Sequence, residues 1–149
     1  MAETPQWNEL KKIPLFADLT ETEIYQVMRL SFEKKYTPGS TLFVEGMAGE
    51  VLYIIKSGRV DIIKKTAAGE VVLVQLGAGE FLGELSLIDD SKRSATARVS
   101  AESELVVITR KCFQEMLHGD PAITSKLLLH ILKVTVSRLR ATDKRLELH

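Results

Sequence analysis

The sequence predicts a mainly β fold with flanking helices, and three observations support this prediction. Short runs rich in β-branched residues occur at 51–55, 60–63 and 71–76, as expected for strands of an antiparallel sheet. Eight of the nine glycines lie between Gly39 and Gly83, roughly one for each strand connection. Helical patterns occupy the sequence on both sides of this region. Such frequent tight corners favour a barrel, roll or sandwich over an open sheet.

A short helical segment is expected first, over about residues 6–31. Its helix start is marked at Thr20, where Thr-Glu-Thr-Glu resembles a capping box. The apolar residues that follow have helical spacing: Ile24, Val27, Met28 and Leu30. The antiparallel β region should then occupy residues 32–109.

C-terminal helices are expected over residues 110–149. Pro121 is well placed as the first residue of a long helix, and no glycine or proline follows it. Because 149 residues is the usual size of one domain, we expect a single domain over residues 1–149. The predicted order is therefore helix, β region and helices.

The composition argues against several classes of protein. Hydrophobic residues make up 45% of the chain and charged residues 27%, which is the balance of a globular protein. The 20 basic residues offset 20 acidic ones, so no overall field attracts nucleic acid or an anionic membrane. No signal-like start or membrane-length apolar run is present, and a cytoplasmic protein is expected. Any anion site must be built locally.

Residues 79–97 are the most informative segment for function. Gly83 precedes a sequence suited to one or two helical turns, whose free N–H groups can receive an anionic or hydroxyl oxygen. Glu84 offers acceptors for hydroxyl donors, and Arg93, nine residues later, offers a planar fork that matches phosphate. Each residue alone is most simply interpreted as a surface group, but the combination fits a sugar phosphate.

This combination resembles the phosphate-binding cassette of the cyclic nucleotide-binding domain family, which includes catabolite activator proteins and the regulatory subunits of cyclic-AMP-dependent protein kinase. The resemblance covers nearly the whole chain, through Leu-Phe-Ala-Asp-Leu at 15–19, Ile-Lys-Ser-Gly at 55–58, the cassette and the terminal helix. It implies an eight-stranded jelly-roll-like β-roll with N-terminal helices and a long C-terminal helix. It also implies a receptor or regulatory module whose ligand is a cyclic nucleotide.

The resemblance assigns roles to individual cassette residues. Glu84 would accept the ribose 2′-hydroxyl, and the backbone at Gly83 and Leu85 would line the same end of the ligand. Arg93 would bind the cyclic phosphate.

The two residues after the arginine complete the cassette. Ser94 would donate its hydroxyl and backbone N–H to phosphate oxygens, and Ala95 would leave room for the ring. A threonine at the position of Ser94 often accompanies cyclic GMP preference in the family, so serine leaves the base selectivity open, and we favour cyclic AMP. Lys92 replaces the proline of the kinase-type cassette and adds positive potential near the phosphate.

The terminal helix carries further candidates. Residues recur at steps of four and three, the pattern of a coiled-coil seam: Leu128, Leu132, Thr135, Leu139, Thr142 and Leu146. The seam predicts either packing on the chain's own barrel or a homodimer through this helix. By the resemblance, Thr142 would contact the base and Arg138 would lie near the ribose-binding glutamate. Asp143 replaces a serine that the partner subunit supplies in the bacterial regulators. Binding would be relayed through the helix to an effector protein that the sequence does not identify.

The positions of the histidines and of the cysteine argue against other functions. A cupin enzyme would need several metal-binding histidines on its strands, but His118, His130 and His149 lie outside the β region, so we expect no catalytic or metal-binding residues and no cofactor. Haem or iron–sulfur binding would need more than Cys112, which is expected to be a half-buried thiol. The alternative function is a scaffold with a cassette that is empty or binds another anion. Because the sequence ends at His149, we expect either a stand-alone sensor or the sensor part of a longer transcription regulator.

Overall fold

The computed structural model of the chain describes residues 4–90 and 92–147, with side chains for residues 8–90 and 92–141. The N-terminal helices are α1 (Thr4–Lys11), the 3₁₀ helix η1 (Pro14–Phe16) and α2 (Glu21–Leu30). The strands are β1 (Phe32–Tyr36), β2 (Thr41–Phe43), β3 (Val51–Thr66), β4 (Gly69–Gly77), β5 (Phe81–Leu82) and β6 (Thr96–Thr109). The 3₁₀ helix η2 (Glu84–Leu87) lies between β5 and β6, and α3 (Arg110–Gly119) and α4 (Pro121–Glu147) follow β6.

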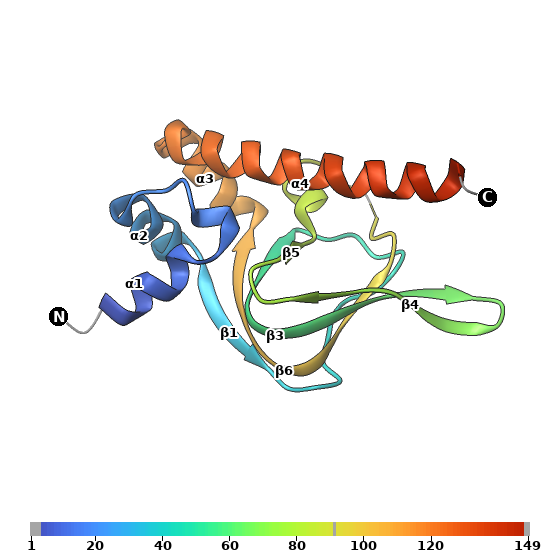
Figure 1. The fold of residues 1–149 in the computed structure, drawn as a ribbon. Coiled ribbons are helices and arrows are strands. Elements are labelled where there is room, and N and C mark those ends of the chain that lie inside the picture. The colour runs from blue at the N-terminus through green and yellow to red at the C-terminus, as the bar shows by residue number, and fades with distance from the viewer. Residues whose placement is uncertain (1–3, 91, 148–149) are drawn as a thin grey trace.

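The strands form one antiparallel sheet around the two long strands β3 and β6. The order is β1-β6-β3-β4, with β2 also paired to β6 and β5 paired to β3. Figure 1 shows the sheet curling beneath α4, with α1, α2 and α3 grouped at one end of the molecule. The predicted fold class, mainly β with flanking helices, is confirmed.

The described residues contain six strands, where the resemblance implied eight, because β3 and β6 bend without breaking. The runs 51–55 and 60–63 belong to the same strand, β3. Gly58, one of the glycines expected at a strand connection, is instead in a bulge, with φ +106° and register shifts against β6 on both sides. A Cβ at Gly58 would lie 2.0 Å from the hydroxyl oxygen of Ser103, so only glycine allows this close approach.

The predicted helix start at Thr20 is confirmed as a capping box. The Thr20 side chain accepts a hydrogen bond from the Glu23 N–H at 3.2 Å, and the Glu23 carboxylate accepts one from the Thr20 N–H at 2.9 Å. Glu23 also pairs with Lys126 of α4 at 2.7 Å. This ion pair joins the N-terminal helices to the terminal helix.

Two apolar clusters on opposite faces of β3 form the core. Side chains alternate along a strand, so Ile54 packs against the helices while Tyr53 and Ile55 point into the roll. The helical cluster includes Phe16, Ile24, Phe113, Met116, Ile123 and Leu127. The roll cluster includes Val60, Leu76, Leu82, Ala97, Val99 and Leu105. Cys112 of α3 is half-buried, as expected.

The terminal helix begins at Pro121, as predicted, and packs on the domain through a stripe made by Ile123, Thr124, Leu127 and Ile131. The predicted seam lies at the edge of this stripe. Leu128 and Thr135 are partly buried, whereas Leu132 and Leu139 are 58% and 60% exposed. Leu146 lies outside the described side chains. No helix in residues 4–90 and 92–147 has the length and apolar character needed to cross a membrane.

Candidate functional site

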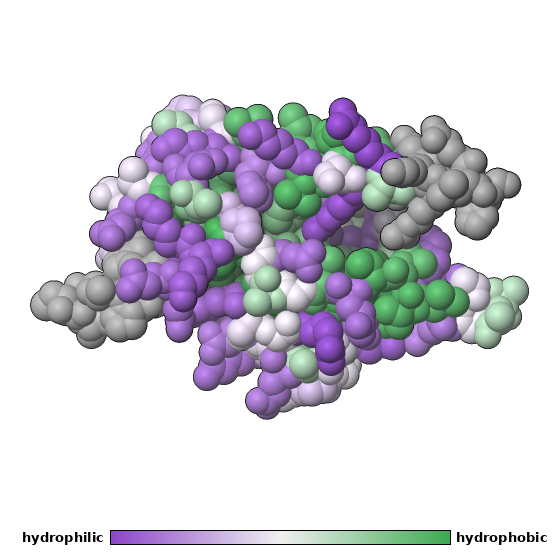
Figure 2. Space-filling view, viewed as in Figure 1, coloured by the Kyte–Doolittle hydropathy of each residue, from purple (hydrophilic) through white to green (hydrophobic). Residues whose placement is uncertain are grey.

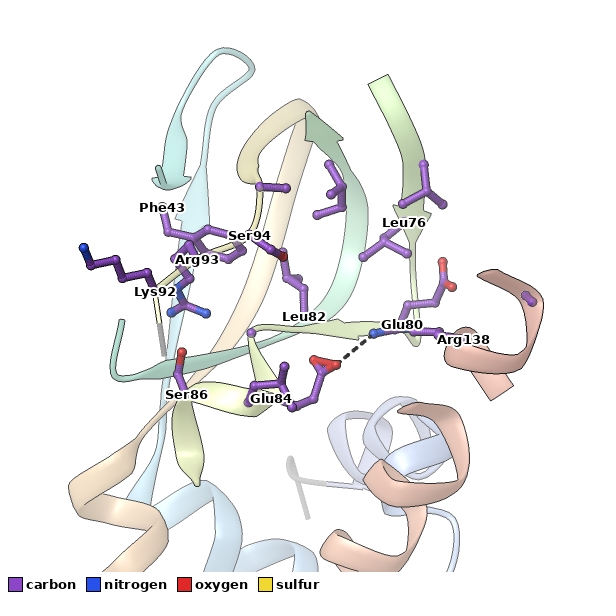
Figure 3. A pocket seen from close by; sticks show the side chains of 16 residues that line it. Phe43, Leu76, Glu80, Leu82, Glu84, Ser86, Lys92, Arg93, Ser94 and Arg138 are labelled. Atoms are coloured by element: carbon purple, nitrogen blue, oxygen red, sulfur yellow. Dashed lines mark hydrogen bonds and ion pairs between the residues drawn. The ribbon is translucent and has the colours of Figure 1, made fainter. Parts of the chain in front are cut away.

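An open cavity of about 590 Å³ is lined by residues of the roll, η2 and α4. This volume is in the range of small-molecule binding sites. Seven of the sequence candidates line it: Gly83, Glu84, Leu85, Arg93, Ser94, Ala95 and Arg138. Its apolar walls come from residues to which the sequence assigned no binding role, including Ile62 and Val74. Phe43, Leu76 and Leu82, labelled in Figure 3, also belong to these walls.

Gly83 makes the turn into η2. Its φ of +83° is left-handed, a conformation that glycine adopts without a steric cost. A Cβ at Gly83 would lie 2.6 Å from Nη1 of Arg93 and 2.7 Å from the carbonyl oxygen of Val51. Leu87, at the end of η2, packs into the helical core, whereas Leu85 is 56% exposed. The glycine therefore allows the backbone to approach the arginine closely, and the core fixes the other end of η2.

Arg93 is the most buried charged residue among those that line the cavity, with 9% exposure. Its guanidinium donates to the carbonyl oxygen of Val51 at 3.1 Å and lies 4.1 Å over the ring of Phe43. Among the described residues, its buried Nε has no hydrogen-bond partner. Burial lowers the pKa of this guanidinium, while Tyr53 and Glu84 act to raise it. An arginine does not lose its charge at neutral pH, so the cavity contains a desolvated cation.

Glu84 lies at a second polar point of the cavity, and Arg138 of α4 contacts it. The two side chains form an ion pair at 3.4 Å, which is drawn in Figure 3. The Glu84 side chain is 12% exposed. Arg138 also donates to the carbonyl oxygen of Phe81 at 2.8 Å and lies 4.9 Å over its ring. Arg138 thus attaches the terminal helix to the cassette.

The other cassette positions differ in what they present to the cavity. Ser94 is exposed, and its backbone carbonyl oxygen accepts a hydrogen bond from Nζ of Lys64 at 2.7 Å. Ala95 is buried. Lys92 lines the rim, but its side chain points away from the other lining residues in Figure 3. The positive potential expected from Lys92 therefore acts from the edge of the site.

Some sequence interpretations are extended or left open by the structure. Thr142 lies in α4, but its side chain is outside the described residues, and its neighbour Ala141 lines the cavity. Asp90, whose side chain is exposed, forms an ion pair with Arg110. Neither Phe43 nor Arg110 lies in a motif that marks it in the sequence.

The comparisons with known proteins agree with this geometry. The family model described as "Cyclic nucleotide-binding domain" matches residues 33–120, more than half of the chain. The chain belongs to this family. Its fold is therefore that of a cyclic nucleotide-binding domain.

Two curated relatives and one solved structure illustrate the family. A cyclic AMP receptor protein of Thermus thermophilus is 31% identical over 140 residues, which cover 93% of this chain and 63% of the relative. A cAMP-dependent protein kinase regulatory subunit of Yarrowia lipolytica is 29% identical over 72% of this chain and 28% of its own. A cyclic nucleotide-binding domain from Methylobacillus flagellatus has a TM-score of 0.83 at 27% identity, and the match covers 96% of this chain and 83% of that one. The chain spans less than two thirds of the length of both curated relatives.

Proposed function

We propose that the cavity binds a cyclic nucleotide, with the phosphate at Arg93 and the ribose 2′-hydroxyl at Glu84, and that the chain acts as a receptor and not as an enzyme. One observation carries the proposal: Arg93 is 9% exposed, and its Nε has no partner among the described residues. A buried cation with an unpaired hydrogen-bond donor is unfavourable unless an anion offsets its charge and accepts that hydrogen bond. A phosphate supplies several acceptors at this point.

The shape of the cavity supports a ligand with one anionic and one apolar end. Arg93 and Glu84 lie at the cassette, whereas Ile62, Val74 and Leu76 form an apolar wall from β3 and β4. An anionic cyclic phosphate and a flat base match these two environments. Ser94 and Ala95 complete the phosphate end, and the backbone at Gly83 and Leu85 completes the ribose end.

We favour cyclic AMP over cyclic GMP as the ligand. The names of both curated relatives refer to cyclic AMP, and the chain aligns with them through the cassette. The residue proposed to read the base is Thr142.

Relay through α4 is proposed from the position of Arg138. This side chain bridges the helix to Glu84 and to the carbonyl oxygen of Phe81. A ribose hydroxyl that binds Glu84 changes the surroundings of the same carboxylate, so an occupied cavity favours a different set of helix positions. Amide hydrogen exchange over residues 128–141, with and without cyclic AMP, tests the relay, and unchanged protection on saturation would show that α4 is a fixed brace.

A homodimer through α4 is proposed from its exposed leucines. Leu129, Leu132 and Leu139 are 54%, 58% and 60% exposed, and at 100° per residue they share one side of the helix. Figure 2 shows a further hydrophobic surface over β4, where the valines and leucine of 71–74 are each 45–53% exposed. Light scattering after gel filtration should give twice the monomer mass, and Leu132→Asp with Leu139→Asp should give a monomer. Ser137→Asp, on α4 but outside the leucine stripe, is the matched control.

Calorimetric titration with cyclic AMP, cyclic GMP and the two linear 5′-monophosphates tests the proposed function. The proposal predicts saturable binding of a cyclic nucleotide, with cyclic AMP bound more tightly than cyclic GMP and the linear forms bound weakly. Binding of none of the four would support an empty scaffold. Preference for a linear monophosphate would indicate a site for another anion.

A further inference from the structure

Arg110, the first residue of α3, does not line the cavity, but it binds two backbone segments, one of which lines the cavity at Ser86. Its Nε donates to the carbonyl oxygen of Ser86 at 2.7 Å. Its Nη2 donates to the carbonyl oxygens of Asp89 at 2.6 Å and Gly49 at 3.2 Å. Its Nη1 pairs with the carboxylate of Asp90. One guanidinium therefore joins the loop at Gly49 to the cassette.

These two segments are the ones that flank the guanidinium of Arg93. A Cβ at Gly49 would lie 2.1 Å from Nε of Arg93, and one at Gly83 would lie 2.6 Å from its Nη1. The Ser86 N–H donates to the carbonyl oxygen of Gly83 at 3.1 Å, so the carbonyl that Arg110 binds lies in the same turn. The backbone at Gly49 and at Gly83 borders the space that the Arg93 guanidinium occupies. The size of this space therefore depends on how firmly these two segments are held.

We infer that Arg110 is a positioning residue for the anion site, and that it links this site to α3. The inference rests on the proposed function of the cavity. The Arg110 side chain is only 18% exposed, and its planar fork serves three carbonyl oxygens at once. Asp90 is 88% exposed, so its ion pair is screened by water and contributes little. The contacts with the carbonyl oxygens therefore carry the role.

The same residue connects the cassette to α3, separately from the connection that Arg138 makes to α4. Arg110 is in the first turn of α3, and its backbone N–H donates to the carbonyl oxygen of Glu50 at 2.8 Å. Phe113 and Met116 of α3 are buried in the helical core. A displacement of the Gly49 loop or of η2 on binding is thus transmitted directly to a helix that is packed in the core.

Three variants and one control test the inference. Arg110→Gln removes the charge and the fork, Arg110→Lys keeps the charge but loses the fork, and Asp90→Asn removes only the ion pair. Arg98→Gln is the control, because Arg98 is a partly exposed sheet residue that pairs with Glu70. Each protein is measured in two ways: amide hydrogen exchange without ligand, and titration with cyclic AMP and cyclic GMP.

The expected pattern separates positioning from general stability. Exchange in Arg110→Gln should become faster over residues 47–51 and 84–90, and its affinity for both nucleotides should fall by about tenfold or more. The factor should be the same for the two nucleotides, because they share the phosphate and ribose. Arg110→Lys should lose most of this affinity as well, while Asp90→Asn should stay close to wild type.

Two results would overturn the inference. One is an exchange pattern in Arg110→Gln that is unchanged over 47–51 and 84–90. The other is an affinity loss no larger than that of Arg98→Gln. If the wild type binds neither nucleotide, the proposed function fails, and the exchange of the unliganded variants alone decides whether Arg110 holds the two segments.

Discussion

Arg93→Gln removes the buried cation of the cavity while keeping a polar side chain of similar length. Among the described residues, the Arg93 side chain makes one hydrogen bond, to the carbonyl oxygen of Val51 at 3.1 Å, and its guanidinium lies 4.1 Å from the centre of the Phe43 ring. Losing these contacts costs stability, but removing a desolvated charge whose Nε lacks a partner among the described residues offsets the loss. We expect the free energy of unfolding to change by about 1 kcal/mol or less.

The effect on binding should be much larger. Truncating one member of a buried charge pair costs about 2–5 kcal/mol, because the other charge is left desolvated and unpaired. At about 1.4 kcal/mol for each factor of ten, this corresponds to a loss of roughly 30-fold to 4000-fold in affinity. Arg93→Lys keeps the charge but loses the planar fork, so its affinity should lie between those of wild type and Arg93→Gln.

Calorimetric titration with cyclic AMP gives the affinities, and urea unfolding without ligand gives the stabilities. We expect Arg93→Gln to change the affinity for cyclic AMP strongly and the free energy of unfolding only slightly. Equal affinity in wild type and Arg93→Gln would refute the assignment of the phosphate to Arg93. A variant that loses stability and affinity together would show that the guanidinium is a structural group of the β-roll.

Three further perturbations follow from the same structure. Glu84→Gln should reduce the preference for cyclic AMP over its 2′-deoxy analogue, measured by competition, and a wild type without that preference would assign Glu84 another role. Gly49→Ala should weaken binding about tenfold or more, because its Cβ would lie 2.1 Å from the buried arginine, whereas Gly77→Ala, with nothing within 4 Å, should bind normally. The hydrogen bond from Lys126 is the main cause that lowers the pKa of Glu23 below its ordinary 4.5. The interaction of the Glu23 carboxylate with Lys126 therefore stabilises the fold fully above about pH 4.5, and this stabilisation is lost as the pH falls through the lowered pKa of Glu23. Urea midpoints should thus fall more between about pH 6 and 3.5 in wild type than in Lys126→Met, and parallel curves would contradict this ion pair.

Much of the fold could be predicted because its signals are local. The capping box of Thr20 and Glu23 joins residues three positions apart, and Pro121 needs only its own fixed φ to begin a helix. The β-branched runs predicted strands for the same reason. The described residues contain fewer strands than the resemblance implied because β3 and β6 each continue without a break. In β3 the chain bends at a bulge around Gly58, and a bulge is defined by the partner strand and not by the residue itself.

Part of the site could also be predicted, since its chemistry depends on residue types at short spacing. Gly83, Glu84 and Arg93 lie within one segment, and the structure brings all three to the cavity. What they contact comes from elsewhere in the chain. Phe43 of β2 contacts Arg93, and Arg138 of α4, which is 54 residues after Glu84 in the sequence, contacts Glu84.

The sequence by itself therefore determined which groups this chain has for binding an anion and which helices and strands surround them. These properties follow from side-chain chemistry and from backbone preferences within a turn or two. Only the tertiary structure decided that Arg93 lies between Gly49 and Gly83, and that Arg110 binds the backbone on both sides. Contacts of this kind depend on sheet register and on the packing of α3 and α4. They are formed by the folded chain as a whole, and no neighbouring residues in the sequence specify them.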